Sequence, residues 1–416
     1  MRELFSKTIA ADGWLKYWSV YIMAFPFYLF PAGSIQPGDL FIMIVLGLFI
    51  AKEGLFYKKN FAPHVKNFRN LLVYICVVNF ILFIVRIGMF NKGLSWFVVD
   101  SFYLFNFLIF CFCFALYTKY GKEFIYTTVF SIVASALLQV VLSPLGNINE
   151  GRETLFFTNP NQLGYYSLAS LTIILALEKY LKVSRTIIFL SFACFFYFTM
   201  LCVSKAAIGG MIILIFIYLV SNKLFSLRTM FTTLVVGVGL LAALLYSETG
   251  ARFTRNLTYR LEHSVKPKDI SEWDYRGYDR MENHPYYMIL GAGEGAYNRF
   301  DTYIDNHEMH SSLGTILFCY GIPGSIMFII FIVSLLRGLP WTYGIYMVPL
   351  IAYGVAHMGL RFTIFYIALA MFPIARSALK ESRGQDSVPV VVRSRKKKFM
   401  KPLWQMQNKP GSPDLT

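Results

Sequence analysis

The sequence predicts an all-α polytopic membrane protein with about twelve transmembrane helices and one large external loop before the tenth. The composition is 56% hydrophobic and only 15% charged, with a mean hydropathy of +0.53. Apolar runs recur from Trp18 to Ala378 with few gaps. A soluble chain could bury one or two such runs in a core, but not a continuous series of them, so we set a soluble fold aside.

Each predicted helix is an apolar run long enough to cross most of the hydrocarbon layer, at about 1.5 Å of rise per residue. Nine precede the loop and three follow it: residues 18–30, 40–51, 71–85, 97–117, 124–142, 162–177, 186–203, 207–220, 230–246, 313–336, 341–356 and 358–375.

The distribution of Lys and Arg predicts that both termini are cytoplasmic, because cytoplasmic loops carry the basic excess. On the predicted cytoplasmic side the connections hold thirteen basic residues: Lys52, Lys58, Lys59, Lys66, Arg69, Lys119, Lys122, Lys179, Lys182, Arg185, Lys223, Arg228 and Arg337. The short external connections hold five: Arg86, Lys92, Arg152, Lys205 and Arg361.

No repeat or linker divides the chain, so residues 1–381 are predicted to form one membrane domain with an external loop at about 247–310. Within the loop we expect a helix over about 273–282, before Gly291, Gly293 and Gly295. Residues 382–416 are rich in Lys, Ser, Gln and Pro, which is typical of a disordered cytoplasmic tail.

The net charge is +16, and ten of the 39 basic residues follow Phe372, at the C-terminal end. Such a segment beside a membrane suits anionic lipid headgroups, and nothing else in the sequence supports a nucleic-acid partner. The six cysteines lie in apolar segments without CxxC spacing, so we expect unpaired packing residues.

The first candidate catalytic residues are Glu308 and His310, at the entry to the helix that starts near Ser311. A helix N-terminus favours an anion, and an imidazole can act as a general base on a sugar hydroxyl near neutral pH. The alternative is a structural helix entry, capped by Ser311 or Ser312.

Candidate anion-binding residues come from the same region. Arg276 and Arg280 are four residues apart and would share a helix face, from which two guanidinium groups could bind a phosphate. Pairing with Glu272 and Asp279 on a solvated face is the alternative.

Two further cations lie at the predicted outer boundary. Lys205 follows Ser204 between two apolar runs, where a cation is costly unless it is paired or hydrated; snorkelling is the alternative. Arg152 precedes the turn TNPNQLG at residues 158–164 and is either a further external cation or part of a solvated loop.

Motifs of metal and nucleotide sites are missing from the sequence. There is no HExxH, no P-loop and no Asp-x-Asp pair, so we expect neither a metal nor a cofactor. The GAGEG segment at residues 291–295 does not follow a strand of a βαβ unit, which favours a tight turn.

Four segments in order resemble the superfamily of O-antigen ligases and O-antigen polymerases. They are FFTNPNQLGYY (156–166), SKAA (204–207), RGYDRMENHPYYMILGAGEG (276–295) and HEMHSSLGTILFCYGIPGSI (307–326). His310 matches the essential His of that superfamily, and Arg276 and Arg280 match its loop Arg. Lys205 stands where a membrane Arg is usual, which keeps the charge but loses the bidentate fork. Ser311 replaces the usual Asn.

The resemblance implies a metal-independent glycosyltransferase of the C-type fold in the bacterial inner membrane. Such enzymes take a glycan from an undecaprenyl-diphosphate carrier at the outer face and pass it to a lipid-linked acceptor. The RGYDR and GAGEG segments favour a polymerase of O-antigen or exopolysaccharide, to which a chain-length regulator could be a partner. Two alternatives stay open: a ligase that transfers glycan to the lipid A core, and a transporter of lipid-linked glycan that uses Arg86, Lys205 and Arg361 as a hydrated path.

Overall fold

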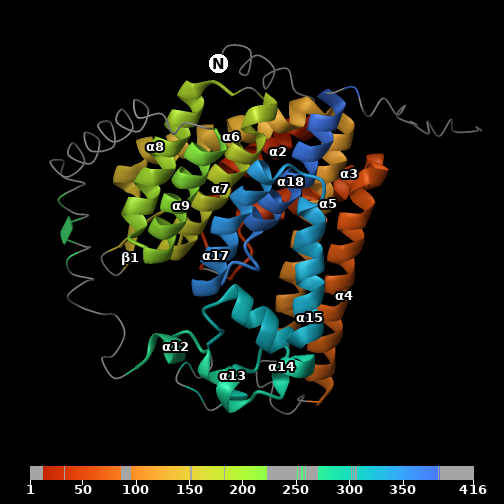
Figure 1. Ribbon diagram of the computed structural model, residues 1–416, viewed down its shortest axis with the longest axis vertical. Helices are drawn as coiled ribbons and strands as arrows, with labels where there is room; N and C mark the ends of the chain where they lie inside the picture. The colour runs from red at the N-terminus through yellow and green to blue at the C-terminus, as the bar shows by residue number, and fades with distance from the viewer. Residues whose placement is uncertain are drawn as a thin grey trace, which may run out of the picture. The chain divides into compact units, whose positions relative to one another are not determined.

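A computed structural model describes most of the 416-residue chain (Figure 1). The described residues are 13–31, 33–85, 95–149, 152–181, 183–222, 270–300, 302, 304, 307–382 and 384, with 251, 254, 255 and 258. The chain divides into two units, Met1–Leu379 and Lys380–Thr416. The predicted helix at 230–246 and nearly all of the predicted tail at 382–416 lie outside the described residues.

The first unit consists mainly of α-helices. Before the loop these are α2 (Gly13–Ala24), α3 (Pro37–Glu53), α4 (Ala62–Val85), α5 (Ser95–Tyr120), α6 (Lys122–Val141), α7 (Pro160–Leu181), α8 (Arg185–Cys202) and α9 (Lys205–Ser221). The loop contributes α12 (Glu272–Tyr275), α13 (Asp279–Asn283) and α14 (Tyr287–Leu290), and after it come α15 (Ser312–Leu336), α16 (Trp341–Gly344), α17 (Val348–Ala356) and α18 (Thr363–Ser382). Single 3₁₀ turns lie at Lys59–Phe61, Ser143–Leu145, Tyr297–Arg299 and Ile345–Met347.

Six of the described helices are long and apolar enough to cross a membrane, which confirms a multi-pass, mostly helical membrane protein. They span Lys59–Val85, Phe97–Tyr120, Lys122–Val141, Arg185–Cys202, Ser312–Leu336 and Thr363–Ser382, and Lys205–Ser221 is a shorter apolar helix. The count of twelve spans stays a prediction.

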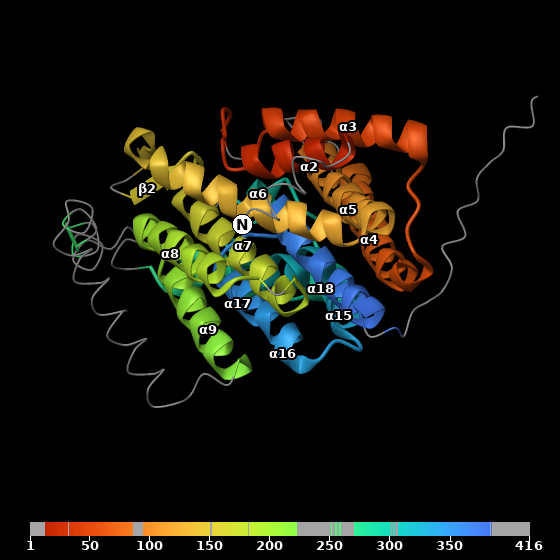
Figure 2. The same ribbon diagram turned by 90° about the horizontal axis from the view of Figure 1, so that it is seen from above.

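Three groups of helices build the core. α4 packs against α5 and α15, α7 packs against α8 and α9, and α2 packs against α3 and α6 (Figure 2). α18 is the most enclosed of the six candidate spans, with 83% of its most apolar window buried. It reaches α4 through stacked rings of Phe68 and Tyr366, 5.0 Å apart, and α7 through Tyr165 and Phe365, 6.2 Å apart.

Local sequence explains where several helices begin. Pro37 opens α3, with the Asp39 carboxylate accepting from the Gln36 N–H at 3.1 Å in a capping-box arrangement. Ser311 caps α15 by accepting from the Gly314 N–H at 2.9 Å. The sequence left Ser311 and Ser312 open as the cap of this helix, and the structure shows that the cap is Ser311.

Three predicted helices differ from the observed ones because of Pro and Gly. α2 ends at Ala24 rather than near residue 30, since Pro26 and Pro31 follow. The segment 341–356 is broken into α16, a 3₁₀ turn and α17, with Pro349 in the first turn of α17. α18 begins at Thr363 rather than near residue 358, so residues 357–362 form a turn that carries His357 and Arg361.

The single helix predicted over 273–282 is wrong. α12 and α13 are separate short helices, because Gly277 takes a φ of 79° between them. The described residues also include a short antiparallel hairpin, β1 (Asn147–Asn149) and β2 (Arg152–Leu155). Figure 1 shows α12, α13 and α14 at the bottom of the view, where the lower end of α4 also lies, and α14 packs against α15.

The GAGEG segment packs into a kink of α15. Gly321 has a φ of 64°, which interrupts the helix, and Pro323 has no N–H to donate to the Cys319 carbonyl. The Gly293 N–H donates to that carbonyl at 2.7 Å, and the Ala292 N–H donates to the Phe318 carbonyl at 2.9 Å. The GAGEG segment therefore satisfies open backbone groups of a helix that is long and apolar enough to cross a membrane.

Candidate active site

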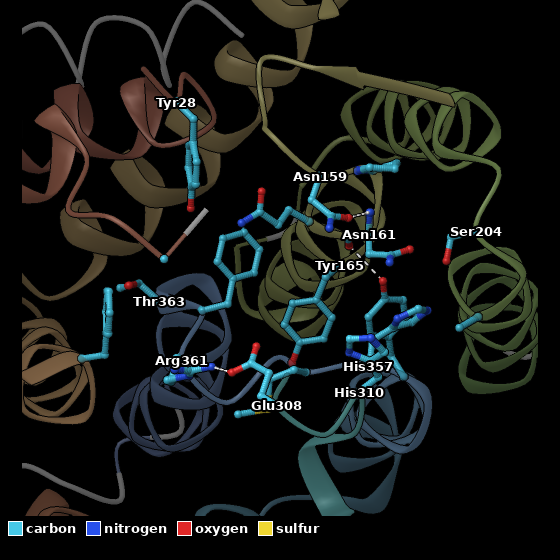
Figure 3. Close-up of a pocket in the computed structure, with 18 of the residues that line it drawn as sticks. Tyr28, Asn159, Asn161, Tyr165, Ser204, Glu308, His310, His357, Arg361 and Thr363 are labelled. Carbon is cyan, nitrogen blue, oxygen red and sulfur yellow. Dashed lines mark hydrogen bonds and ion pairs between the residues drawn. The ribbon is translucent and has the colours of Figure 1, made fainter. Parts of the chain in front are cut away.

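A cavity of about 940 Å³ lies where alternate connections of the chain meet (Figure 3). Its walls come from the α2–α3 connection, the first turns of α5, the segment from β2 into α7, the α8–α9 turn, α12 with the end of the loop, and the α17–α18 turn. Segments separated by more than 300 residues, such as Tyr28 and Thr363, thus share one cavity.

Five of the six residues predicted as site residues line this cavity: Arg152, Lys205, Arg276, Glu308 and His310. The sixth, Arg280, does not. These five residues lie in four separate segments of the sequence. In the fold, three cations, a carboxylate and an imidazole line the same cavity.

Arg152 is a buried cation that ties three elements together. Its Nε donates to the Cys202 carbonyl at the end of α8 at 2.8 Å. Its Nη2 donates to the Asn161 Oδ1 in the first turn of α7 at 3.0 Å. Only 8% of the residue is exposed. Arg152 therefore has a strong structural role in addition to its position in the cavity wall.

Lys205 is the first residue of α9 and is exposed. Two residues before it, Val203 has a φ of 46°, which turns the chain sharply between α8 and α9. Within the part of the chain that the structure describes, the Lys205 ammonium has no hydrogen bond or ion pair, so its charge is available to a ligand in the cavity.

Arg276 joins the loop to the α17–α18 turn. Its Nη1 donates to the Ala356 carbonyl, and its Nη2 lies 3.5 Å from the Glu272 carboxylate. Its own carbonyl accepts from the His310 N–H at 3.0 Å. Because one residue contacts both segments, the imidazole and this guanidinium are held on the same wall.

Arg280 is fully buried outside the cavity, although the sequence grouped it with Arg276. It donates to the His307 carbonyl at 2.7 Å and to the Thr302 hydroxyl at 3.3 Å, and it lies over the Tyr297 ring. The break at Gly277 separates the two arginines, so the shared helix face does not exist. The observed contacts give Arg280 the role of holding the loop together.

His310 is half-buried in the cavity wall, immediately before the capped start of α15. Burial lowers its pKa from the usual value, and the positive charges of Arg276, the neighbouring His307 and Arg280 lower it further. The imidazole is therefore neutral at neutral pH, which is the form that accepts a proton.

Glu308 forms an ion pair with Arg361 across the cavity. Its side chain is 36% exposed and that of Arg361 is 23% exposed. Glu308 precedes α15 in the sequence, whereas its partner Arg361 lies in the α17–α18 turn, after α15.

His357 and Arg361 are among the cavity residues that were not predicted as site residues. Arg361 was considered only as an external cation and as part of the hydrated path of the alternative transporter, and His357 was assigned no role. Ser312 holds their turn: its N–H and hydroxyl donate to the His357 carbonyl at 3.2 and 3.0 Å, and its hydroxyl accepts from the Gly359 N–H at 2.7 Å. The sequence did contain a signal for these two residues, because a His and an Arg lie together in one short connection between apolar segments.

The six cysteines are free, as predicted, and five are buried. Among the described residues, no group of three or more His, Cys, Asp or Glu side chains could hold a metal ion. Comparison with models of known protein families and with curated protein sequences gives no match to this chain.

Proposed function

We propose that the protein is a glycosyltransferase that moves a glycan from an undecaprenyl-diphosphate carrier to a lipid-linked acceptor, as a polymerase of O-antigen or exopolysaccharide at the outer face of the inner membrane. The convergence of Arg152, Lys205 and Arg276 with His310 in one cavity carries the proposal. The order of the four segments that resemble the O-antigen ligase and polymerase superfamily supports it.

The chemistry needs a base and fixed positive charge. The acceptor hydroxyl oxygen attacks the anomeric carbon, the new C–O bond forms, and the bond from that carbon to the carrier diphosphate breaks. His310 takes the hydroxyl proton, and the diphosphate leaves with the electron pair of the broken bond. Fixed cations such as Lys205 and Arg276 stabilise the charge that develops on it. A single displacement of this kind inverts the anomeric centre.

Deletion of the gene in the organism of origin tests the reaction. Loss of a polymerase is expected to leave glycan of a single repeat on lipid A, or unpolymerised repeat units on the carrier. Accumulation of long glycan on the carrier would identify a ligase instead. Unchanged glycan length and amount would contradict both.

Variants of the cations test the proposed diphosphate contact. Lys205→Ala and Arg276→Ala are expected to weaken the use of the lipid-linked donor, because each removes a charge-assisted contact. Lys205→Arg keeps the charge and is expected to be tolerated. Transfer assays at several donor concentrations with purified protein in nanodiscs separate a raised donor KM from a lowered kcat. An unchanged donor KM in both alanine variants would contradict this assignment.

The same preparation separates an enzyme from a transporter. In liposomes that carry lipid-linked glycan only on the side facing the cavity, an enzyme forms product without moving lipid. Appearance of the lipid on the other leaflet without product would replace the proposed function with transport.

A further inference from the structure

Glu294, in the middle of the GAGEG segment, is a fully buried carboxylate inside the helix bundle. The hydroxyls of Tyr103 and Tyr320 both donate to its Oε1 at 2.6 Å. Its own N–H donates to the Asn79 Oδ1 at 2.8 Å, and the Asn79 amide donates to the Asp100 carboxylate at 2.7 Å. α4, α5 and α15 therefore all take part in fixing this one side chain.

The second oxygen of Glu294 faces Arg361. Among the described residues Oε2 has no hydrogen-bond partner, and it lies 4.0 Å from the Arg361 Nε. The other end of the same guanidinium pairs with Glu308 at the cavity surface. Arg361 is thus held between a buried carboxylate behind it and a half-exposed carboxylate in front of it. The Asn106 amide also donates to its carbonyl at 3.2 Å.

We call the part of the cavity around Arg361 and Glu308 the Arg361 arm, and the part that holds Lys205 and Arg276 the cationic arm. The two arms differ in charge. A guanidinium between two carboxylates has no net positive charge left to attract a diphosphate, and Glu308 would repel one. In Figure 3, Tyr28, Thr363 and Arg361 lie on one side, Ser204, Asn161 and His357 lie on the other, and Glu308 lies between them. Lys205 follows Ser204 directly, and Arg276 contacts Ala356, the neighbour of His357.

Aromatic side chains line the same arm. Phe102 and Phe105 lie within one turn of Asn106 on α5, and Phe362 follows Arg361 directly. Apolar rings with a few fixed donors and acceptors are typical of pockets for ligands that have both apolar faces and hydroxyl groups. A sugar ring fits this description, because its C–H faces can lie on the rings while its hydroxyls donate to Glu308 and accept from Arg361.

We infer that the arm around Arg361 is a subsite for an uncharged sugar ring, and that Glu294 is the positioning residue that builds it by holding Arg361. The inference rests on the proposed function, in which the cationic arm takes the carrier diphosphate. The acceptor glycan, which is extended by the reaction, then binds in the Arg361 arm.

The test measures binding of two probes to purified protein in nanodiscs. The first probe is undecaprenyl diphosphate without sugar. The second is the oligosaccharide released by mild acid from the lipid-linked glycan that accumulates in the deletion strain. Glu294→Gln and Arg361→Gln are each expected to weaken oligosaccharide binding about tenfold, the scale of a lost charge-assisted contact. Phe102→Ala removes an apolar ring face and is expected to weaken this binding by a similar factor. All three variants are expected to leave carrier binding unchanged.

Three further variants complete the design. Lys205→Ala is expected to give the reverse pattern, with weakened carrier binding and normal oligosaccharide binding. Glu53→Gln is the matched control, since Glu53 pairs with Lys119 and does not line the cavity. Glu294→Asp keeps the carboxylate and is expected to recover part of the oligosaccharide affinity. If Glu294→Gln does not fold, Arg361→Gln and Phe102→Ala still decide the question.

Selective loss of carrier binding in Arg361→Gln would make Arg361 a phosphate ligand and overturn the inference. Equal loss of both probes, or loss of neither, would also overturn it. These results are distinct from failure of the proposed function, in which no lipid-linked glycan accumulates after deletion and no oligosaccharide can be prepared.

Discussion

At the scale of single residues, the neutral state of His310 has direct consequences for activity. Its lowered pKa means that the base form is present at neutral pH and is lost as the pH falls through that pKa, which lies below the usual value of about 6.5. Transfer is therefore expected to be constant near neutral pH and to decline on the acid side. Arg276→Gln removes a positive charge and should move this decline to higher pH, as a pH–rate profile would show.

His310→Ala is expected to reduce transfer by about 10²-fold or more, the usual scale for loss of a general base. The half-buried imidazole contributes little to packing, so insertion into the membrane should be normal. His284→Ala is the matched control, because His284 lies in the same loop but outside the cavity. Normal glycan length and amount in cells carrying His310→Ala would remove His310 from the mechanism.

At the scale of elements, the contact between the GAGEG segment and the kink of α15 is expected to limit stability. A Cβ on Gly291 would lie 2.5 Å from the Cys319 carbonyl oxygen, and one on Gly321 would lie 2.7 Å from the Gly291 nitrogen. Both glycines have positive φ. Gly291→Ala and Gly321→Ala are each expected to destabilise the protein by about 2 kcal/mol or more, seen as earlier thermal unfolding in detergent.

Gly47→Ala is the control for these substitutions. Gly47 lies within α3 and has no positive φ, and among the described residues no neighbouring atom lies within 4 Å of the point that a Cβ would occupy. Alanine should therefore be neutral or slightly stabilising there. Equal thermal unfolding of Gly321→Ala and wild type would show that the kink is not a strained contact.

The element scale also shows what the sequence can and cannot predict. Within the described residues, hydrophobic runs located eleven helical segments, because an apolar run long enough to cross lipid is a local property of the sequence. The ends of the helices were less predictable. The predicted span 358–375 includes Arg361, whereas α18 begins at Thr363 and Arg361 lies in the turn at 357–362. The pairing of Glu308 with Arg361 and the burial of Glu294 depend on contacts between distant segments, which spacing along the chain does not reveal.

The sequence predicted part of the grouping of the site residues, because a change in composition is also a local property. His310, Glu308 and Arg276 lie at the loop–membrane boundary, and the boundary is visible as a change in composition. Arg280 was misgrouped because the helix pattern of 273–282 gave no weight to Gly277. The Arg280 guanidinium contacts the His307 carbonyl, the Thr302 hydroxyl and aromatic rings, all within the loop itself.

At the scale of the whole molecule, the Lys and Arg distribution predicts that the cavity opens to the exterior. A reporter fused after Ser264 should behave as external and one fused after Arg383 as cytoplasmic; both positions lie outside the described residues. Ser34→Cys, in the exposed α2–α3 connection that lines the cavity, should react with a membrane-impermeant maleimide in intact spheroplasts. Reporters on the same side would make the number of spans wrong by an odd number.

The order in which the cavity walls occur along the chain affects biosynthesis. Tyr28 emerges from the ribosome long before Arg361, Phe362 and Thr363, and the most enclosed helix begins at the last of these. The pocket therefore stays incomplete through most of translation. A nascent chain stalled anywhere before α18 would display its cations at the membrane surface without a closed site, so prematurely terminated products should be inactive even when they are stably inserted.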